Sequence, residues 1–220
     1  MGIEQLIREC HIPPTFVIYT PSPKSCPHLP PPNCLAFFST QLKSGLCIPI
    51  LSSYSDVACL FGVLLNQLVP NYFRLLATFF MVFRFHYFPV STSIFTQCYR
   101  LKRVETGFFV FMPRPGISFL PSPHATKNWK KSFFFILSSR PWSFLDRWIQ
   151  EGRPPPQVGE RSIALTSLLD ILNDSPYDCR SLIDERLLGH FVNSSQTATL
   201  KFCTAKLCTA AYCSYLNNII

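Results

Sequence analysis

The sequence predicts an α+β protein: a mainly helical domain with a small antiparallel sheet, a proline-rich N-terminal arm and C-terminal amphipathic helices. Three observations lead to this prediction. Prolines crowd the first segment, apolar residues then recur at helical spacing, and short aromatic runs bounded by glycine or proline follow. With 220 residues, 48% hydrophobic content and 21 Phe, the chain is long and apolar enough to bury one core.

Composition divides the chain into four segments. Prolines recur through the first 33 residues, so we expect residues 12–33 to be extended and weakly ordered. Three consecutive prolines at 154–156 mark a linker after the domain. The predicted segments are a proline-rich arm over 1–33, a domain over 34–150, a linker with amphipathic helices over 151–192, and an unassigned cysteine-containing tail over 193–220.

Apolar periodicity predicts the helices of the first half of the domain. Leu35, Phe37, Phe38 and Leu42 form an approximate helical stripe that stops at Gly45, a plausible C-terminal cap. A second apolar stretch follows Pro49, and Pro70 suits the first turn of a helix over 71–85. Either Ser91 or Ser93 can begin a further helix that runs towards Leu101.

The aromatic runs predict strands. Residues 107–111, 117–120 and 133–137 are short, apolar and bounded by turn residues, so we expect them to form one small antiparallel sheet. A short helix over 141–148 would then close the domain.

Beyond the linker, leucines at positions 165, 168, 169 and 172 follow the i, i+3, i+4, i+7 pattern of an amphipathic helix. A similar stripe at positions 183, 187, 188 and 191 predicts a second one. Their apolar faces pack either on the domain, which we favour, or on another chain, so self-association through these helices is an alternative.

The ten cysteines are interpreted as mostly free thiols, because a chain of this size does not need disulfides and its first 11 residues hold no apolar signal core. Cys26 and His28 with Cys34, or Cys10 with His11, could supply metal ligands in principle. No Cys-x₂-Cys pair accompanies them, and prolines stiffen the segment. We therefore expect no metal and no cofactor.

The segment 57–83 is the strongest membrane-span candidate. It contains Arg74, which is costly in a bilayer, and its cleanest apolar run is only the nine residues 75–83, whereas a span needs ~20. Buried core helices are favoured over a membrane helix. A membrane-associated protein built on residues 57–88 stays an alternative.

Basic charge is concentrated in one quarter of the chain. Ten Lys or Arg and three acids fall within residues 99–153, which favours an anionic partner such as RNA or DNA. Lysines and arginines can neutralise phosphates, while Trp129 can stack on bases. The competing interpretation is that Trp129 and residues 133–135 pack in the sheet while the lysines stay hydrated. The candidate nucleic-acid-binding residues are Arg100, Lys102, Arg103, Lys127, Trp129, Lys130 and Lys131, with Arg140 and Arg147 as further phosphate contacts.

No pattern of catalytic residues is visible. A transposase-type nuclease needs three carboxylates around two metal ions, yet only Asp56 and Glu105 lie between Glu9 and Asp146. The acids that cluster at positions 170–185 suit a solvated helix face or helix capping. Aspartic-protease, phosphate-binding and dinucleotide-binding motifs are also missing from the sequence. We therefore expect a protein that is not an enzyme.

Four motifs follow one another along the chain. They are Gly45-Leu46 followed by Pro49; Gln67-Leu68-Val69-Pro70-Asn71; Leu101-Lys102-Arg103 before Gly107-Phe108-Phe109-Val110-Phe111; and Lys127-Asn128-Trp129-Lys130-Lys131-Ser132-Phe133-Phe134-Phe135. In this order they resemble a plant family, the gypsy-type transposase domain of retrotransposon-derived proteins. The similar stretch runs from about Ile3 to Trp148, and Asn128 stands where the family commonly has Gly, while Phe108 replaces Trp or Tyr. The resemblance carries over no catalytic residue.

The resemblance implies a retrotransposon-derived, non-catalytic, gag-like protein. The basic aromatic region, taken by itself, predicts weak binding to nucleic acid. Besides the membrane alternative, a degenerate fragment without function is a third hypothesis. The sequence favours a location inside the cell without deciding between nucleus and cytoplasm.

Overall fold

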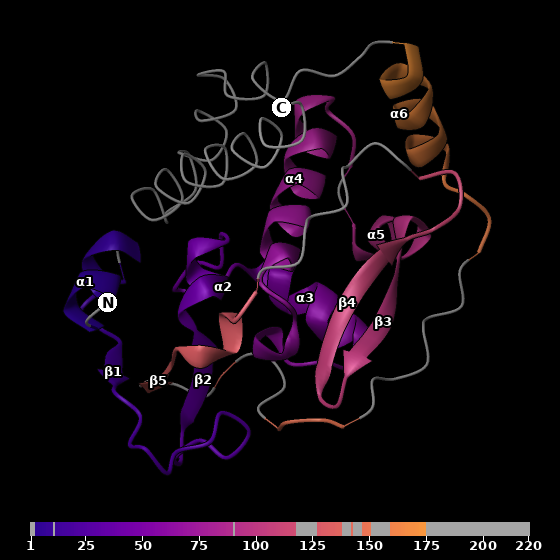
Figure 1. Ribbon diagram of the computed structural model, residues 1–220. Coiled ribbons are helices and arrows are strands. Elements are labelled where there is room, and N and C mark those ends of the chain that lie inside the picture. Colours follow the sequence, from indigo (N-terminus) through magenta and orange to yellow (C-terminus); the bar gives the residue numbers. More distant parts are fainter. Residues whose placement is uncertain are drawn as a thin grey trace.

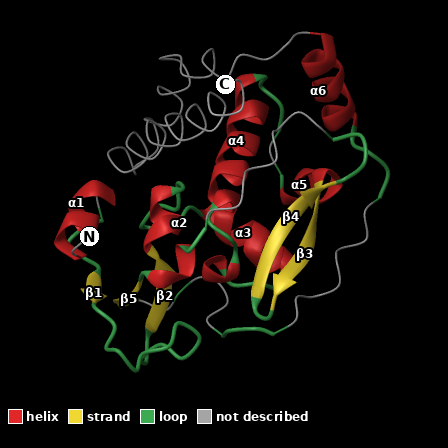
Figure 2. Ribbon diagram, in the orientation of Figure 1, coloured by secondary structure: helices red, strands yellow, loops and turns green. Residues whose placement is uncertain are grey.

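A computed structural model describes residues 3–10, 12–89, 91–117, 127–137, 142, 147–150 and 159–174. These residues form an α+β structure, as predicted, which combines helices with two small antiparallel sheets (Figures 1 and 2). The helices are α1 (Ile3–Cys10), α2 (Ser39–Lys43), α3 (Ser52–Phe61), α4 (Asn71–Phe85), α5 (Thr92–Cys98) and α6 (Ile163–Asp174), with 3₁₀ turns η1 (Leu65–Gln67) and η2 (Trp129–Lys131). The strands are β1 (Val17–Tyr19), β2 (Cys34–Phe38), β3 (Tyr99–Glu105), β4 (Phe108–Pro113) and β5 (Phe133–Leu137).

The first sheet has the strand order β1-β5-β2, and both pairings are antiparallel. Phe134 and Ile136 of the central strand β5 join the main core, whereas Phe135 packs with Cys34 and Ala36 in a smaller apolar cluster. Because successive side chains of a strand point to opposite faces, both faces of this sheet carry apolar packing. The strand at 133–137 is confirmed.

The helix predicted from residue 34 to Gly45 is wrong in its first half. Cys34–Phe38 is strand β2, buried along its whole length, and only Ser39–Lys43 is helical. A short apolar run fits a buried strand as well as a helix, and the partner decides between them. Here β5 offers five consecutive backbone partners to β2.

The N-terminal segment contributes to the same core. Leu6 of α1 and Ile12 are buried in the main cluster. Residues of β1 pair with β5, with Ile18 opposite Ile136. The extended backbone expected from the prolines is therefore used as a third strand.

The helix predicted over 71–85 is confirmed as α4. The helix predicted from Ser91 towards Leu101 ends earlier, at Cys98, and Ser91 is its N-cap, with its hydroxyl accepting from the N–H of Ile94 at 3.2 Å. Strand β3 begins at Tyr99, because an antiparallel partner, β4, lies beside it. The predicted single sheet is thus two sheets, β1-β5-β2 and β3-β4.

Three other predicted elements fall largely or wholly on residues outside those described. Ile117, the first residue of the predicted strand 117–120, is described and buried but is not in a strand. Most of the helix predicted over 141–148, and all of the second amphipathic helix after residue 182, lie outside the described ranges.

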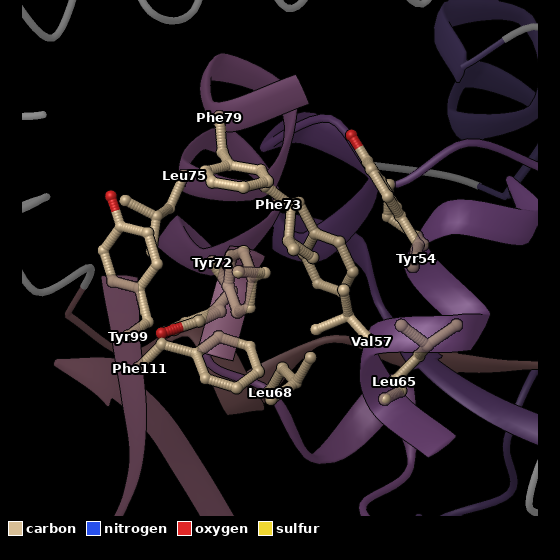
Figure 3. Packing of buried hydrophobic residues seen from close by; sticks show 14 of the residues in the cluster. Tyr54, Val57, Leu65, Leu68, Tyr72, Phe73, Leu75, Phe79, Tyr99 and Phe111 are labelled. Carbon is tan, nitrogen blue, oxygen red and sulfur yellow. The ribbon is translucent and has the colours of Figure 1, made fainter. Parts of the chain in front are cut away.

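The main core is aromatic and is organised around α4 (Figure 3). Tyr72 of α4 lies 4.5 Å from Phe111 of β4, measured between ring centroids, and Phe79 of α4 lies 6.3 Å from Tyr99 of β3. Tyr54 of α3 packs at 6.1 Å on the α4 side chain of Phe73. These contacts hold the β3–β4 hairpin against the helices.

Helix α6 packs on the domain, as the sequence favoured. Leu165, Leu168 and Leu169 are buried members of the main cluster. The backbone N–H of Ser162 donates to Oε1 of Gln97 at 2.8 Å, which ties the start of α6 to α5.

Among the described residues, no helix is both long and apolar enough to cross a membrane.

Three buried side-chain amides join the two sheets. Gln41 donates to the carbonyls of Asn66 at 3.0 Å and Leu68 at 2.7 Å. Asn66 donates to Ala36 of β2 at 2.7 Å. Gln67 donates to the carbonyl of Gly107, in the β3–β4 turn, at 2.9 Å. Turn η1 therefore connects both sheets through hydrogen bonds that water cannot replace in the core.

Gln67→Leu is expected to lower the free energy of unfolding by about 2–3 kcal/mol, because it leaves the carbonyls of Gly107 and Ile149 without their donor. Chemical denaturation measures the loss. Gln150→Leu is the control at an exposed glutamine, for which we expect a change within about 0.5 kcal/mol. Equal stability of the two variants would contradict the role given to the Gln67 amide.

We expect stability to fall as the pH rises above about 10, the usual tyrosine pKa. Burial raises the pKa of Tyr54, Tyr72 and Tyr99 above its ordinary value, and it raises the pKa of the Cys98 thiol to about 12. A group whose pKa is raised by folding stays protonated to a higher pH in the folded state than in the unfolded chain. Its contribution to the free energy of unfolding is complete below the unfolded pKa, and it is lost as the pH rises through the folded pKa. Denaturation midpoints from pH 8 to 12 test this, and a flat profile would contradict it.

Candidate nucleic-acid interface

The predicted binding residues lie on two segments that meet at one end of the β3–β4 hairpin. Arg100, Lys102 and Arg103 belong to β3, and Lys127 to Lys131 form or precede η2. The two segments are joined at Glu105, the last residue of β3, whose carboxylate forms an ion pair with Nζ of Lys130. The fold therefore brings residues 127–131 to the turn end of the hairpin, whereas Arg100 lies towards the other end of β3.

Strand β3 presents its basic side chains on both sides. Arg100 stands opposite Met112, and Lys102 stands opposite Val110. Both cations lie on one face of β3, and the buried Tyr99 lies on the other face. Arg103 stands opposite the buried Phe109, so it lies at the rim of the core-facing side, where it is exposed.

Trp129 has a packing role. Its ring meets Phe38 of β2 edge-on at 4.7 Å and Phe108 of β4 edge-on at 5.0 Å, which bridges the two sheets. Asn128 precedes it with φ 58°, a left-handed conformation that Asn tolerates better than most residues. The two ring contacts favour the packing interpretation of Trp129 over base stacking.

The three lysines around Trp129 differ in environment. Lys127 and Lys131 are exposed. Lys130 is half-buried, with Nζ 4.5 Å from the centroid of the Phe108 ring and 5.6 Å from that of Trp129. A cation over an aromatic face is stabilised by the ring quadrupole, so Lys130 partly serves to hold η2 on the hairpin.

Of the two further predicted phosphate contacts, Arg147 is among the described residues and Arg140 is not. Arg147 is exposed, close in sequence to Trp148, whose ring packs edge-on against Phe108 at 5.2 Å. Arg140 lies outside the described residues.

Sequence reasoning missed two features of the region. It did not recognise that Glu105 neutralises Lys130, because the two are 25 residues apart and only the fold joins them. It also missed that β3 is a strand, although the alternation Tyr99-Arg100-Leu101-Lys102 is a period-two signal that could have shown it.

Within the described ranges, no group of three or more His, Cys, Asp or Glu side chains is placed to hold a metal ion. Sγ of Cys26 lies 2.9 Å from Nδ1 of His28, whereas Cys34 is buried in β2. The thiols of Cys26, Cys34, Cys59 and Cys98 are free.

Comparisons of the chain with protein-family models, with curated proteins and with solved structures found no match. The resemblance to the gypsy-type transposase domain therefore stays a hypothesis based on the four motifs.

Gly107→Ala is expected to lower the free energy of unfolding by at least about 1–2 kcal/mol. Gly107 has φ +74°, and an added Cβ would lie 2.4 Å from Nε1 of Trp148, so both the backbone and the ring would be strained. Gly159→Ala is the matched control, because a Cβ there meets nothing within 4 Å. Thermal unfolding of both variants measures the difference, and a neutral Gly107→Ala would contradict the close packing of Trp148.

Proposed function

We propose that this protein is non-catalytic and binds nucleic acid through the surface formed by β3 and residues 127–131, the basic surface. One observation carries the proposal. Strand β3 and residues 127–131 hold six basic side chains and one acidic side chain, and the Glu105–Lys130 ion pair joins the two segments at the turn end of the hairpin. Such a concentration of positive charge attracts a polyanion and neutralises its phosphates.

The binding is mainly electrostatic. Lysines and arginines release condensed counterions from the phosphates that they contact, so affinity falls steeply with salt concentration. Phosphate contacts by themselves carry no sequence information. The packing of Trp129 between Phe38 and Phe108 leaves the cations as the main source of affinity.

We further propose a retrotransposon-derived, gag-like origin. The support is that residues of three of the four motifs have defined structural roles in this fold. Gln67 is fully buried and bonds to the turn at Gly107, and Trp129 joins the two sheets. Residues that join the sheets and helices of a fold are expected to be retained among proteins that have that fold.

Self-association through the C-terminal helices is the weaker part of the prediction. Leu165, Leu168 and Leu169 of α6 are buried in the domain, whereas Ile163 and Ile171 of the same helix are exposed. A contact between chains would have to use other residues than the buried leucine stripe.

Removing four exposed cations is expected to weaken binding of the full chain to duplex DNA and to flatten its salt dependence. In Arg100→Ala/Lys102→Ala/Lys127→Ala/Lys131→Ala, the slope of log affinity against log salt should fall by about 3–4, since each lost phosphate contact removes about 0.9. Fluorescence anisotropy across a salt series measures it.

Two further variants serve as controls. Lys24→Ala/Lys43→Ala removes two exposed cations on parts of the chain that Figure 1 places apart from the hairpin, and it should leave the slope unchanged. Glu105→Gln should tighten binding, because it removes the acid and releases Lys130 for a phosphate. Equal affinity of all variants, or no binding by the folded protein, would refute the proposal.

A further inference from the structure

We propose that the β3–β4 hairpin enters the major groove of duplex DNA and reads base edges with the face that carries Arg100, Lys102, Val110 and Met112, the ribbon face. This inference rests on the proposed nucleic-acid binding and deepens it by naming the nucleic acid and the contact surface. The major groove of B-form DNA is wide enough to admit a two-stranded antiparallel ribbon.

The register of the hairpin defines the ribbon face. Residues directly opposite each other in an antiparallel pair project to the same side, which groups Arg100 with Met112 and Lys102 with Val110. The other side holds Tyr99 and Phe111, which are buried. On the ribbon face, Arg100 and Lys102 are exposed, while Val110 and Met112 are half-buried. The side with Tyr99 and Phe111 is therefore anchored in the core. On the ribbon face the two cations are exposed, whereas Val110 packs partly against the main cluster.

The spacing of the two cations suits a duplex. Side chains two residues apart on a strand are separated by ~7 Å, and successive nucleotides of one strand rise ~3.4 Å along the duplex axis. Arg100 and Lys102 can therefore contact positions two steps apart on a ribbon that follows the groove. The positive charge of the basic surface continues at the turn end of the hairpin, where Lys130 pairs with Glu105.

The chemistry of the ribbon face matches base edges as well as phosphates. Arginine and lysine are the commonest donors to O6 and N7 of guanine in the major groove, and apolar side chains contact the methyl group of thymine. Val110 and Met112 lie directly beside the two cations.

The same face is poorly suited to single strands or to RNA duplexes. Single-strand binding relies on aromatic rings that stack on bases. Phe108 is the aromatic residue that continues the ribbon face, and it is buried under Trp129, Trp148 and Lys130. The major groove of A-form RNA is too narrow for side chains to read.

The experiment uses the full chain and DNA with altered bases. A short duplex is first enriched from a random pool by the protein, and its affinity is then compared with that of the same duplex carrying 7-deazaguanine, which lacks the N7 acceptor but keeps every phosphate. We expect the modified duplex to bind at least about fivefold more weakly. Replacing thymine by uracil removes the methyl group and should also weaken binding.

Variants assign the effect to the ribbon face. Arg100→Ala/Lys102→Ala should bind normal and 7-deazaguanine duplexes with nearly equal affinity, whereas Lys127→Ala/Lys131→Ala should weaken both equally and keep the difference. The comparison of normal and modified DNA with the unaltered protein needs no variant, so it stands even where a variant misfolds.

The outcomes separate the two proposals. The ribbon inference would be overturned if salt-dependent binding were unaffected by 7-deazaguanine and uracil, or if the protein enriched no sequence from the pool. A preference for single strands or duplex RNA would overturn it as well. Each of these results would leave the proposed function standing. Absence of binding to every nucleic acid by the folded protein would overturn both. If the unaltered protein prefers normal over modified duplexes and Arg100→Ala/Lys102→Ala does not, the result supports the ribbon inference.

Discussion

The structure depends on η1, and above all on the buried amide of Gln67, which ties the turn of the β3–β4 hairpin to η1 and to Ile149. Its Nε2 donates to the carbonyls of Gly107 and Ile149, and its Oε1 accepts from the N–H of Leu64. A fully buried amide is costly unless its hydrogen bonds are made, so this side chain fixes the hairpin turn, η1 and the segment at Ile149 relative to one another. Apolar packing alone would tolerate several arrangements of short strands on these helices.

The basic surface is a consequence of this junction. Because the hairpin turn is fixed, the Phe108 ring can pack edge-to-face against the rings of Trp129 and Trp148. The contact with Trp129 holds the chain on either side of it against the hairpin. Lys127 and Lys131 then project from a positioned turn. A cation on a positioned backbone loses less conformational entropy on binding a phosphate than one on an unconstrained chain.

Much of the fold could be predicted from the sequence where local signals agree with the tertiary environment. The helix at 71–85 has a proline before it and apolar residues at helical spacing, and the strand at 133–137 is a phenylalanine run. Prediction failed at Cys34–Phe38, where the apolar run fits either a helix or a strand and only pairing with β5 selects the strand. It failed again at Tyr99, where the helix period gives way to a strand because β4 lies alongside.

The sequence by itself determined the class of the fold, the concentration of positive charge, and the residue types able to contact a polyanion, because composition and periodicity are properties of the chain. Tertiary structure alone decided how those residues are used. Whether Trp129 stacks on a base or packs on Phe38, and whether Lys130 is available or paired with Glu105, depends on contacts between residues far apart in the chain. Such long-range contacts leave no mark on local periodicity, so only the folded structure shows which cations are exposed and which hold the protein together.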